Sequence, residues 1–372
     1  MARCGGGKQS TEDLIIVDVT KSYPKKELIL QDFMEVEYIP LETTDEFLTQ
    51  GLVMTVGKEI ILIENRVNDG DIFIFDRNGK ALRKINRKGQ GGEEYIYINQ
   101  IVLDENNNEL FVNTEKKILV YNLYGKFKRS IKYPDKANYA NICNYDKDHL
   151  ICYDSSVNNR DGEERGSQAF HVIISKQDGS ITREIFLPFK TIKTHKIYKD
   201  EYVIVSTSEG YSISPYQNNW ILVELSSDTI YKYAPNGQLT PLIVRTPSIQ
   251  SMDTEVFLFP KNFTDRYCFM ETMKKKVDFE TMKGFPRTDL MYDWQEKAIF
   301  EYTVYNDDYS NKTQVPMRTP INDEIASWQI LEAHRLVEAY TEGQLKDGKL
   351  KEIAAKLEEE DNPVIMLVKY KQ

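Results

Sequence analysis

The sequence predicts an all-β fold: a six-bladed β-propeller of four-stranded blades, with a short C-terminal helical appendage. A recurring strand–turn–strand unit and its spacing predict the propeller, and the loss of β alternation after residue 320 marks the appendage. Residues 73–80 are an apolar strand that runs into a turn at Asn78 and Gly79. An Asn-Gly turn after such a strand is a strong signal for a β-hairpin.

The strand–turn unit recurs along most of the chain. Successive turns lie 46 to 59 residues apart, close to the roughly 40–50 residues of one propeller blade. A pair of β-sandwiches is the competing architecture, because the spacing is irregular. The later copies span residues 120–126, 174–180, 231–238 and 291–297, with turn positions Gly125, Gly179, Gly237 and, in degenerate form, Glu296.

A closed ring needs a sixth blade, because an open array of blades leaves sheet edges exposed. We expect this blade to use the strand at residues 300–305 and the turn at 306–311. The N-terminal strands at residues 14–19 and 36–40 would complete it and close the ring. The propeller is therefore expected to span residues 14–320.

The C-terminal segment, residues 321–372, has a different pattern. Ile325, Trp328 and Leu331 follow an i, i+3, i+6 stripe, which predicts a helix over residues 322–342. A second stripe predicts a helix over residues 349–360, and residues 364–368 are typical of a terminal strand. We expect these helices and the closing strand to pack on the propeller.

Composition fits one large folded unit and narrows the function classes. The 372 residues include 41% hydrophobic and 28% charged residues, which is enough apolar material for a sizeable core. The net charge of −10 argues against a general nucleic-acid binder. The sequence contains no run of 18 apolar residues, so no transmembrane helix is predicted. We expect a monomer that uses no cofactor.

The N-terminus suggests an envelope lipoprotein. Cys4 is followed by three glycines and a polar stretch, an arrangement that suits an acylated Cys on a flexible tether. The apolar signal segment expected before such a Cys is missing from the sequence, and Arg3 is atypical at that position. We expect residues 1–13 to be a tether with a lipid on Cys4; an incidental Cys in a flexible tail is the alternative.

Two further cysteines, Cys143 and Cys152, flank a predicted hairpin. If Lys147 and Asp148 form a two-residue loop, the two thiols lie opposite each other and are close enough for a disulfide. However, Lys-Asp lacks the Gly or Asn that such a loop favours. Two buried free thiols are the preferred interpretation.

One loop carries a family resemblance. Residues 85–95, with Gly89, Gly91, Glu94 and Tyr95, resemble the G-x-G-x-x-E-Y loop of six-bladed β-propeller lipoproteins of Bacteroidetes, which are related to NHL-repeat propellers. Further matching pieces follow in the same order and span nearly all of the chain. The resemblance implies a six-bladed propeller exported to the cell envelope, and it implies no established reaction. These pieces are residues 227–237, 264–267, 284–287 and 361–364.

The candidate ligand-binding residues are charged side chains near predicted strands. Asp265, Arg266 and Tyr267 begin an apolar strand. If they point into the central channel, Arg266 could hold a carboxylate or phosphate while Tyr267 stacks on a sugar. Arg287 and Asp289 are candidates of the same kind. In both cases a structural salt bridge between blades is the alternative.

The remaining motifs predict no specific chemistry. Gly89-x-Gly91 is followed by further β sequence, so a connecting loop is expected rather than a phosphate-binding turn before a helix. Residues 104–109 lack the glycine that a calcium-binding loop needs at its sixth position. The sequence predicts no metal site, because its histidines lack metal-ligand spacing. They are His149, His171, His195 and His334.

We therefore expect an envelope lipoprotein whose propeller binds a glycan, a peptide or an envelope protein, and which meets the membrane only through its lipid anchor. The alternative is a hydrolase or lyase that acts on glycans or peptides in the central channel. Two carboxylates converging in the channel would favour the enzyme, whereas an apolar or water-filled channel would favour binding.

Overall fold

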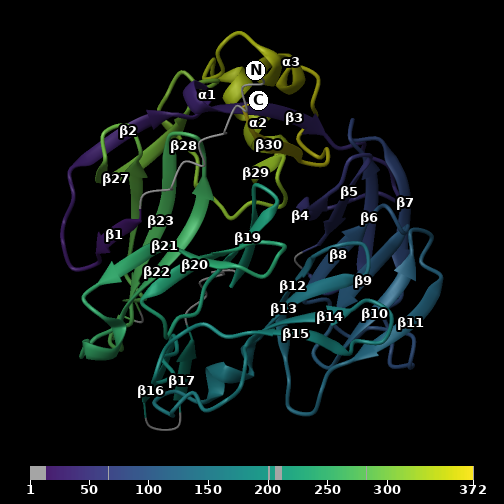
Figure 1. Cartoon of the computed structure of the whole chain (residues 1–372). Helices are drawn as coiled ribbons and strands as arrows, with labels where there is room; N and C mark the ends of the chain where they lie inside the picture. Colours follow the sequence, from purple (N-terminus) through teal and green to yellow (C-terminus); the bar gives the residue numbers. More distant parts are fainter. Residues whose placement is uncertain (1–13, 66, 200–201, 206–211, 282, 372) are drawn as a thin grey trace, which may run out of the picture.

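Six β-sheets lie around a central axis like the blades of a propeller (Figure 1). The computed structural model describes residues 14–371 except for 66, 200–201, 206–211 and 282. The predicted all-β, six-bladed fold class is confirmed. Cys4 and the predicted tether at residues 1–13 lie outside the described residues.

The first three blades are antiparallel sheets of four consecutive strands. Their second strands are buried on both faces, which is why these strands are continuously apolar rather than alternating. The first strands of neighbouring blades lie side by side and surround the axis. The strands are β4 (Leu52–Val56), β5 (Ile60–Glu64), β6 (Asp71–Asp76), β7 (Ala81–Asn86), β8 (Gln100–Asp104), β9 (Glu109–Asn113), β10 (Lys117–Asn122), β11 (Phe127–Lys132), β12 (Tyr139–Asn144), β13 (His149–Asp154), β14 (His171–Ser175) and β15 (Ile181–Ile185).

Blades four and five each gain an N-terminal strand that pairs in parallel with their fourth strand. Blade four therefore holds β1 (Ile15–Asp18), and the prediction that residues 14–19 complete the sixth blade is wrong. Blade four consists of β18 (Ile213–Tyr216), β19 (Asn219–Leu222), β20 (Thr229–Tyr233), β21 (Leu239–Thr246) and β1. Blade five consists of β22 (Val256–Phe263), β23 (Tyr267–Lys274), β26 (Arg287–Asp293), β27 (Ala298–Asn306), β2 (Lys25–Ile29) and the short β28 (Thr313–Gln314).

Blade six closes the ring by pairing the two ends of the chain. Its strands are β29 (Ile325–Leu331), β30 (Val364–Tyr370) and β3 (Met34–Pro40), in that order from the axis outwards. The prediction that residues 36–40 close the ring is thus correct. Residues 300–305, in contrast, belong to β27 of blade five rather than to the sixth blade.

The helix predicted over residues 322–342 begins only at residue 333. Ile325, Trp328 and Leu331 lie on strand β29, which pairs with β30. This strand is buried on both faces at its first two residues, so its apolar positions need not alternate and can imitate a helical stripe. The two helices are α2 (Ala333–Thr341), which ends before Gly343 (φ 68°), and the shorter α3 (Lys349–Ala354).

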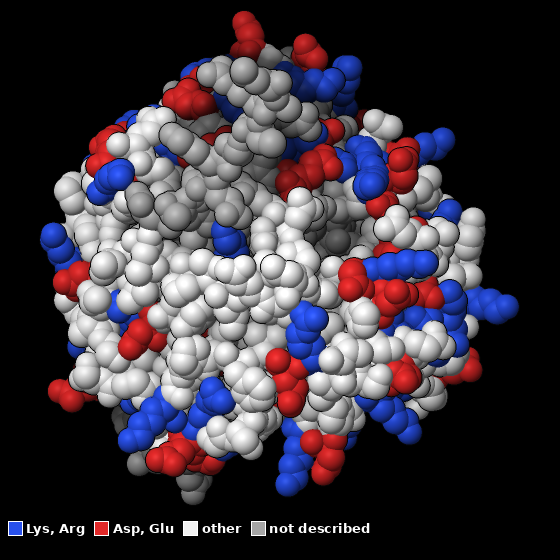
Figure 2. Space-filling view, in the orientation of Figure 1, with Lys and Arg blue, Asp and Glu red and all other residues white. Residues whose placement is uncertain are grey.

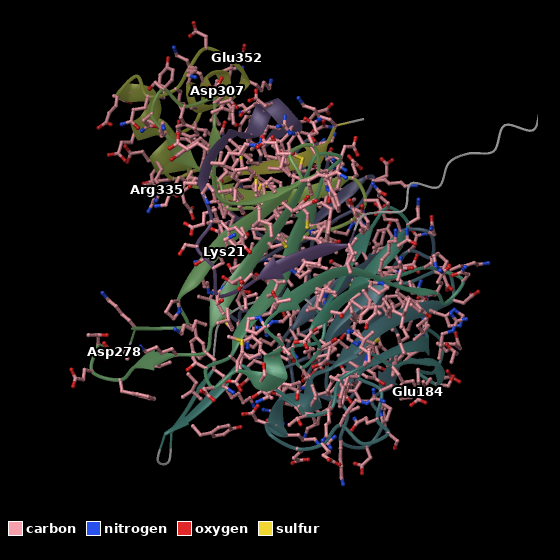
Figure 3. All side chains as sticks on the ribbon, turned by 60° about the vertical axis from the view of Figure 1, so that its left-hand side comes forward. Lys21, Glu184, Asp278, Asp307, Arg335 and Glu352 are labelled. Carbon is pink, nitrogen blue, oxygen red and sulfur yellow. The ribbon has the colours of Figure 1, made fainter. Side chains whose placement is uncertain are left out.

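The remaining elements are short and lie outside the blades. The hairpin of β24 (Val277–Asp278) and β25 (Lys283–Gly284) projects from blade five, where Asp278 marks its tip (Figure 3). A second hairpin pairs β16 (Lys196–Lys199) with β17 (Tyr202–Val205). The others are α1 (Leu30–Phe33), η1 (Ser155–Asn159) and η2 (Ile249–Ser251).

The five turns of the recurring unit join the third strand of a blade to its fourth. The sixth predicted turn, at residues 306–311, instead lies between β27 and β28 of blade five. Gly79 has a φ of 85°, a conformation that side chains with a Cβ rarely adopt. The turn is fixed by Asp76, whose Oδ1 accepts hydrogen bonds from the backbone N–H groups of Asn78 (2.8 Å) and Lys80 (2.9 Å). Asn122 Oδ1 and Asp293 Oδ1 likewise accept hydrogen bonds from backbone N–H groups of the turns that follow them. In the degenerate fifth copy, Lys297 takes the left-handed position (φ 50°).

Polar side chains join the inner strands of successive blades. The Gln100 side chain on blade two bonds to both backbone groups of Ile142 on blade three, at 2.8 and 2.9 Å. Asn141 Oδ1 accepts a 2.9 Å hydrogen bond from the backbone N–H of Ile213 on blade four. Such bonds satisfy backbone groups that would otherwise be left unpaired beside the axis. Apolar clusters fill the spaces between the blades further out.

The three cysteines in the described part of the chain, Cys143, Cys152 and Cys268, are free thiols. Cys143 pairs across the hairpin with Ile151, and Cys152 with Ile142. The register is therefore shifted by one residue from the one that would place the two cysteines opposite each other. Because neighbouring residues of a strand point to opposite faces, the two thiols do not meet. The expected two free thiols are confirmed; Cys152 is buried, whereas Cys143 is half-buried.

Candidate binding site in the central cavity

A cavity of about 1110 Å³ lies within the ring of blades. Its wall is formed by inner strands, by the hairpins that follow them and by the segment that leads into blade six, residues 316–324. The wall carries both charged and aromatic side chains. The volume lies just above the usual range for ligand sites, which extends to about 1,000 Å³.

Blade five contributes a compact group of charged residues to this wall. Glu271 on β23 and Asp289 on β26 are direct cross-strand partners, so both side chains lie on the same face of the sheet. Lys261 lies at a register shift of β22, between Pro260 and Asn262. A β-bulge redirects a side chain in this way and is common beside functional sites. We call Lys261, Glu271, Arg287 and Asp289 the blade-five cluster.

Within the cluster, Arg287 and Lys261 both interact with the Glu271 carboxylate. Arg287 Nη1 donates a 2.8 Å hydrogen bond to Glu271 Oε1, and Lys261 Nζ lies 3.6 Å from the same oxygen. Glu271 is buried, whereas Asp289 is open to the cavity. In the part of the chain that the structure describes, no hydrogen bond reaches the Asp289 carboxylate. Asp289 is thus the member of the cluster that is available to a ligand.

The surroundings raise the pKa of Asp289 above its ordinary value. Desolvation is the main cause, and the neighbouring Glu271 carboxylate adds to it, while Lys261 and Arg287 oppose the shift. Burial, with repulsion from both carboxylates, also raises the pKa of Tyr302. Of the two neighbouring carboxylates, Glu271 is therefore paired with cations, whereas the pKa of Asp289 is raised.

Arg318 brings a further cation to the cavity. It is exposed, and its guanidinium carbon lies 4.8 Å from the centroid of the Trp328 ring. Stacking on an aromatic face holds the planar guanidinium without using its N–H donors. No carboxylate among the described residues lies within ion-pair distance of Arg318. Its donors can therefore accept a carboxylate or phosphate from a ligand.

Aromatic rings line another part of the wall. Tyr145 of blade three and Trp220 of blade four stack with centroids 6.1 Å apart and an interplanar angle of 27°. Trp220 is half-buried, so part of its indole faces the cavity. Aromatic faces of this kind bind sugar rings and peptide side chains.

The predicted residues Asp265, Arg266 and Tyr267 lie apart from the cavity wall. Arg266 Nε and Nη2 donate to Asp293 Oδ2 at 3.2 and 3.1 Å, and Lys26 Nζ donates to the same oxygen at 3.0 Å. Tyr267 is buried, and its ring lies edge-on to Phe33. Arg266, Lys26 and Asp293 all belong to blade five. The contact is therefore a salt bridge within one blade, not the salt bridge between blades that the sequence offered as the alternative. Arg287 and Asp289, in contrast, line the cavity.

The comparisons with known proteins give the family. Residues 6–325 match the model of the 6-bladed beta-propeller family DUF5128. The chain belongs to this family. A search of curated protein sequences finds no match.

Solved structures include chains that are similar to this DUF5128 propeller. A protein of Bacteroides fragilis, inferred to be exported, is similar with a TM-score of 0.60 and 18% identity over 97% of this chain and 100% of that chain. A DUF4221 member from Bacteroides vulgatus has a TM-score of 0.45 and 11% identity over 74% and 90% of the two chains. Virginiamycin B lyase from Staphylococcus aureus has a TM-score of 0.38 and 11% identity over 91% and 100%. The similarity to the Bacteroides fragilis protein concerns the fold alone.

The histidines of the propeller do not gather around one point. His171 is buried, which lowers its pKa to about 4. His149 Nδ1 bonds to Asp146 at the cavity rim. Within the described ranges, no group of three His, Cys, Asp or Glu side chains is arranged to hold a metal ion. None of the described helices has the length and apolar character needed to cross a membrane.

Sequence reasoning missed half of the blade-five cluster and the stacked arginine. Glu271 had a visible signal, because it is the one charged residue in the largely apolar run Tyr267–Met273. Such a residue on a central strand needs a partner or a function. Lys261 and Arg318 had no local signal, since a bulge and a loop bring them to the cavity.

Proposed function

We propose that this DUF5128 propeller is a lipid-anchored protein of the cell envelope that binds a small polar ligand, a glycan or a peptide, in its central cavity. The observation that carries the proposal is the blade-five cluster, which opens into that cavity. Charged groups beside an axial cavity cost desolvation energy. Their presence there is more readily explained by a ligand than by stability.

The chemistry of the wall suits a ligand with groups of both kinds. Asp289 can accept hydrogen bonds from hydroxyl or ammonium groups, and Arg318 can bind a carboxylate. Trp220 offers an aromatic face for a sugar ring or an apolar side chain. A short peptide or an acidic glycan has such a combination of groups.

Charge on the outer surface supports a compact ligand rather than a nucleic acid. Figure 2 shows Lys and Arg side chains interspersed with Asp and Glu on the face in view, without a large basic field. The net charge is −10. A polyanion would need a continuous basic surface. We accordingly propose no nucleic-acid partner, and a monomeric propeller.

A lipid on Cys4 is the proposed anchor. The Cys and the glycines that follow it support this assignment. Mass spectrometry of the protein isolated from its native membrane tests it directly. A diacyl or triacyl mass on Cys4 is expected, and an unmodified thiol would contradict the anchor.

A thermal-shift screen against glycans and short peptides tests the binding proposal. Binding stabilises the folded state by mass action, so a true ligand should raise the melting temperature of the wild type. Arg318→Ala and Asp289→Asn should reduce that rise. Arg335→Ala is the matched control, because Arg335 is an exposed arginine on α2 (Figure 3). If the variants respond like the wild type, the cavity is not the binding site.

A second candidate, a hydrolase or lyase acting on glycans or peptides, is favoured by the pairing of Glu271 with Asp289. Glu271 is held by cations, and the raised pKa of Asp289 brings that carboxyl group closer to the range in which a general acid or base works. Incubation of the screened compounds with enzyme tests this candidate. Turnover that is lost in Asp289→Asn but kept in Arg335→Ala would establish it.

A further inference from the structure

Blade six offers an open sheet edge. Among the blade sheets of the described chain, it has three strands where the others have four or more. Its outermost strand is β3, which pairs with β30 on one side. The position that a fourth strand occupies in blades one to five is therefore unfilled by a strand in blade six.

The backbone of β3 has unpaired groups along that edge. In an antiparallel pair, every second residue directs its N–H and C=O away from the partner strand. Between Glu35 and Ile39, the described chain provides no hydrogen-bond partner for these outward groups. Such groups are a template for the main chain of an added strand.

A groove of about 770 Å³ runs beside this edge. All residues from Glu35 to Pro40 contribute to one wall, and α3 with the residues that follow it, Lys356 and Leu357, forms the other. Arg77 and Asn78, from the turn of blade one, also line it. Figure 1 shows α3 beside β3 at the top of the molecule. A groove between a strand edge and a helix fits an extended peptide that pairs with the strand.

The charges of the groove favour an acidic occupant. On the β3 wall, Glu37 Oε2 is already close to Arg77 Nη2 (3.5 Å) and Lys369 Nζ (3.7 Å). On the opposite wall, Lys349 and Lys356 are exposed, and no described carboxylate lies within ion-pair distance of either.

Two carboxylates in the groove remain without such cations. Glu35 lies on β3, and Glu352 lies on α3 at the outer end of the molecule (Figure 3). Arg77 and Lys369 are shared by Glu37 and Glu324. Lys349 and Lys356 are therefore the cations of the groove beside which an acidic side chain gains most.

We propose that an extended, acidic peptide segment of a partner protein adds to β3 as the fourth strand of blade six. Its main chain bonds to the open edge, and its acidic side chains lie beside Lys349 and Lys356. Seven residues of β3 offer an edge about 20 Å long at roughly 3.3 Å per residue. This surface is separate from the central cavity, and the proposal does not depend on the cavity ligand.

Fluorescence anisotropy with the full chain tests the proposal. The probe is a fluorescein-labelled ten-residue peptide of alternating Glu and Val, and the control peptide has Pro in place of every Val, so that it lacks half of the N–H groups. We expect the probe to bind and the control peptide to bind at least tenfold more weakly. The double variant Lys349→Ala/Lys356→Ala should bind the probe at least fivefold more weakly than the wild type.

Lys351→Ala is the matched control on the same helix, because Lys351 does not line the groove and pairs with Asp347 at 2.8 Å. Its affinity should equal that of the wild type. Hydrogen exchange should slow at the amides of residues 35–39 when the probe binds. Absence of binding, equal binding by the double variant, or unchanged exchange in β3 would each overturn the proposal. Protection of β3 in a concentration-dependent dimer would assign the edge to a second copy and overturn it as well.

Discussion

Glu271 and Asp289 stand directly opposite each other on neighbouring strands of blade five, and both line the central cavity. Like charges in this arrangement repel each other. Arg287 and Lys261 compensate Glu271, whereas Asp289 has a raised pKa. The charged form of Asp289 is therefore unfavourable in the folded protein until a ligand pairs with it.

The first prediction concerns that cost. Asp289→Asn should stabilise the protein at pH 7 by about 0.2–1 kcal/mol, because it removes a like-charge pair. A raised carboxyl pKa means that the folded state holds its proton longer than the unfolded chain, so stability falls as the pH rises through the folded pKa. The gain from the variant should accordingly shrink towards pH 4.

Urea denaturation at pH 4 and pH 7 measures this difference. Asp265→Asn is the control, because Asp265 is exposed and lies outside the cavity wall. Destabilisation by Asp289→Asn at pH 7 would show that the carboxylate is bound by the protein itself and not kept for a ligand.

The second prediction concerns Asp293, the buried acceptor of Arg266 and Lys26. Burial would raise its pKa, but the hydrogen bonds from Arg266 and Lys26 lower it to about 2. The stabilisation is present above the unfolded value of 3.8 and is lost as the pH falls towards 2. Asp293→Asn should lower the melting temperature at pH 7 and have little effect near pH 2.

Arg266→Ala should cause a smaller loss than Asp293→Asn, because Lys26 remains to compensate the carboxylate. Differential scanning calorimetry of the two variants decides this order. If Arg266→Ala changes ligand binding but not the melting temperature, Arg266 serves recognition and our structural assignment fails.

The third prediction concerns Glu64, a buried residue at the end of β5. Burial, with repulsion from Asp69, raises its pKa to about 7. The folded state therefore retains a proton that the unfolded chain releases near 4.5, and stability is lost as the pH rises from 4.5 to 7. Glu64→Gln should stabilise the protein at pH 8 by about 1–3 kcal/mol, and the two proteins should be nearly equal at pH 5. Equal stability at pH 8 would contradict this account.

The fourth prediction concerns Lys176 and Asp104, which join blades two and three. Their charged atoms lie 2.6 Å apart, and both side chains are almost fully buried. Lys176→Met leaves a buried carboxylate without its partner, which should cost about 3–5 kcal/mol. The double variant Lys176→Met/Asp104→Leu should recover much of the lost free energy of unfolding, measured by chemical denaturation. An equal loss in the single and the double variant would show that packing, not charge, dominates.

The propeller could be predicted because its repeat is local. Each glycine or Asx turn joins two strands that are adjacent in the chain, so its position is visible in the sequence. Blade six could not be predicted in the same way, since β3 and β30 are separated by more than 300 residues and pair only when the ring closes. Local periodicity carries no information on such a pairing.

The site was only partly predictable for the same reason. Arg287 and Asp289 alternate along one strand and could be recognised as a polar interruption. Arg318 reaches the cavity from a loop and is held there by Trp328, ten residues further on and across a turn. No local pattern in the sequence indicates that Arg318 stacks on Trp328.

The most direct test of the account is a crystal structure of the propeller with a compound that stabilises it in the thermal-shift screen. The account predicts electron density for that compound in the central cavity, with a carboxylate or phosphate at Arg318 and a hydroxyl or ammonium group at Asp289. Density on the outer surface of the blades, with the cavity occupied by water alone, would contradict it.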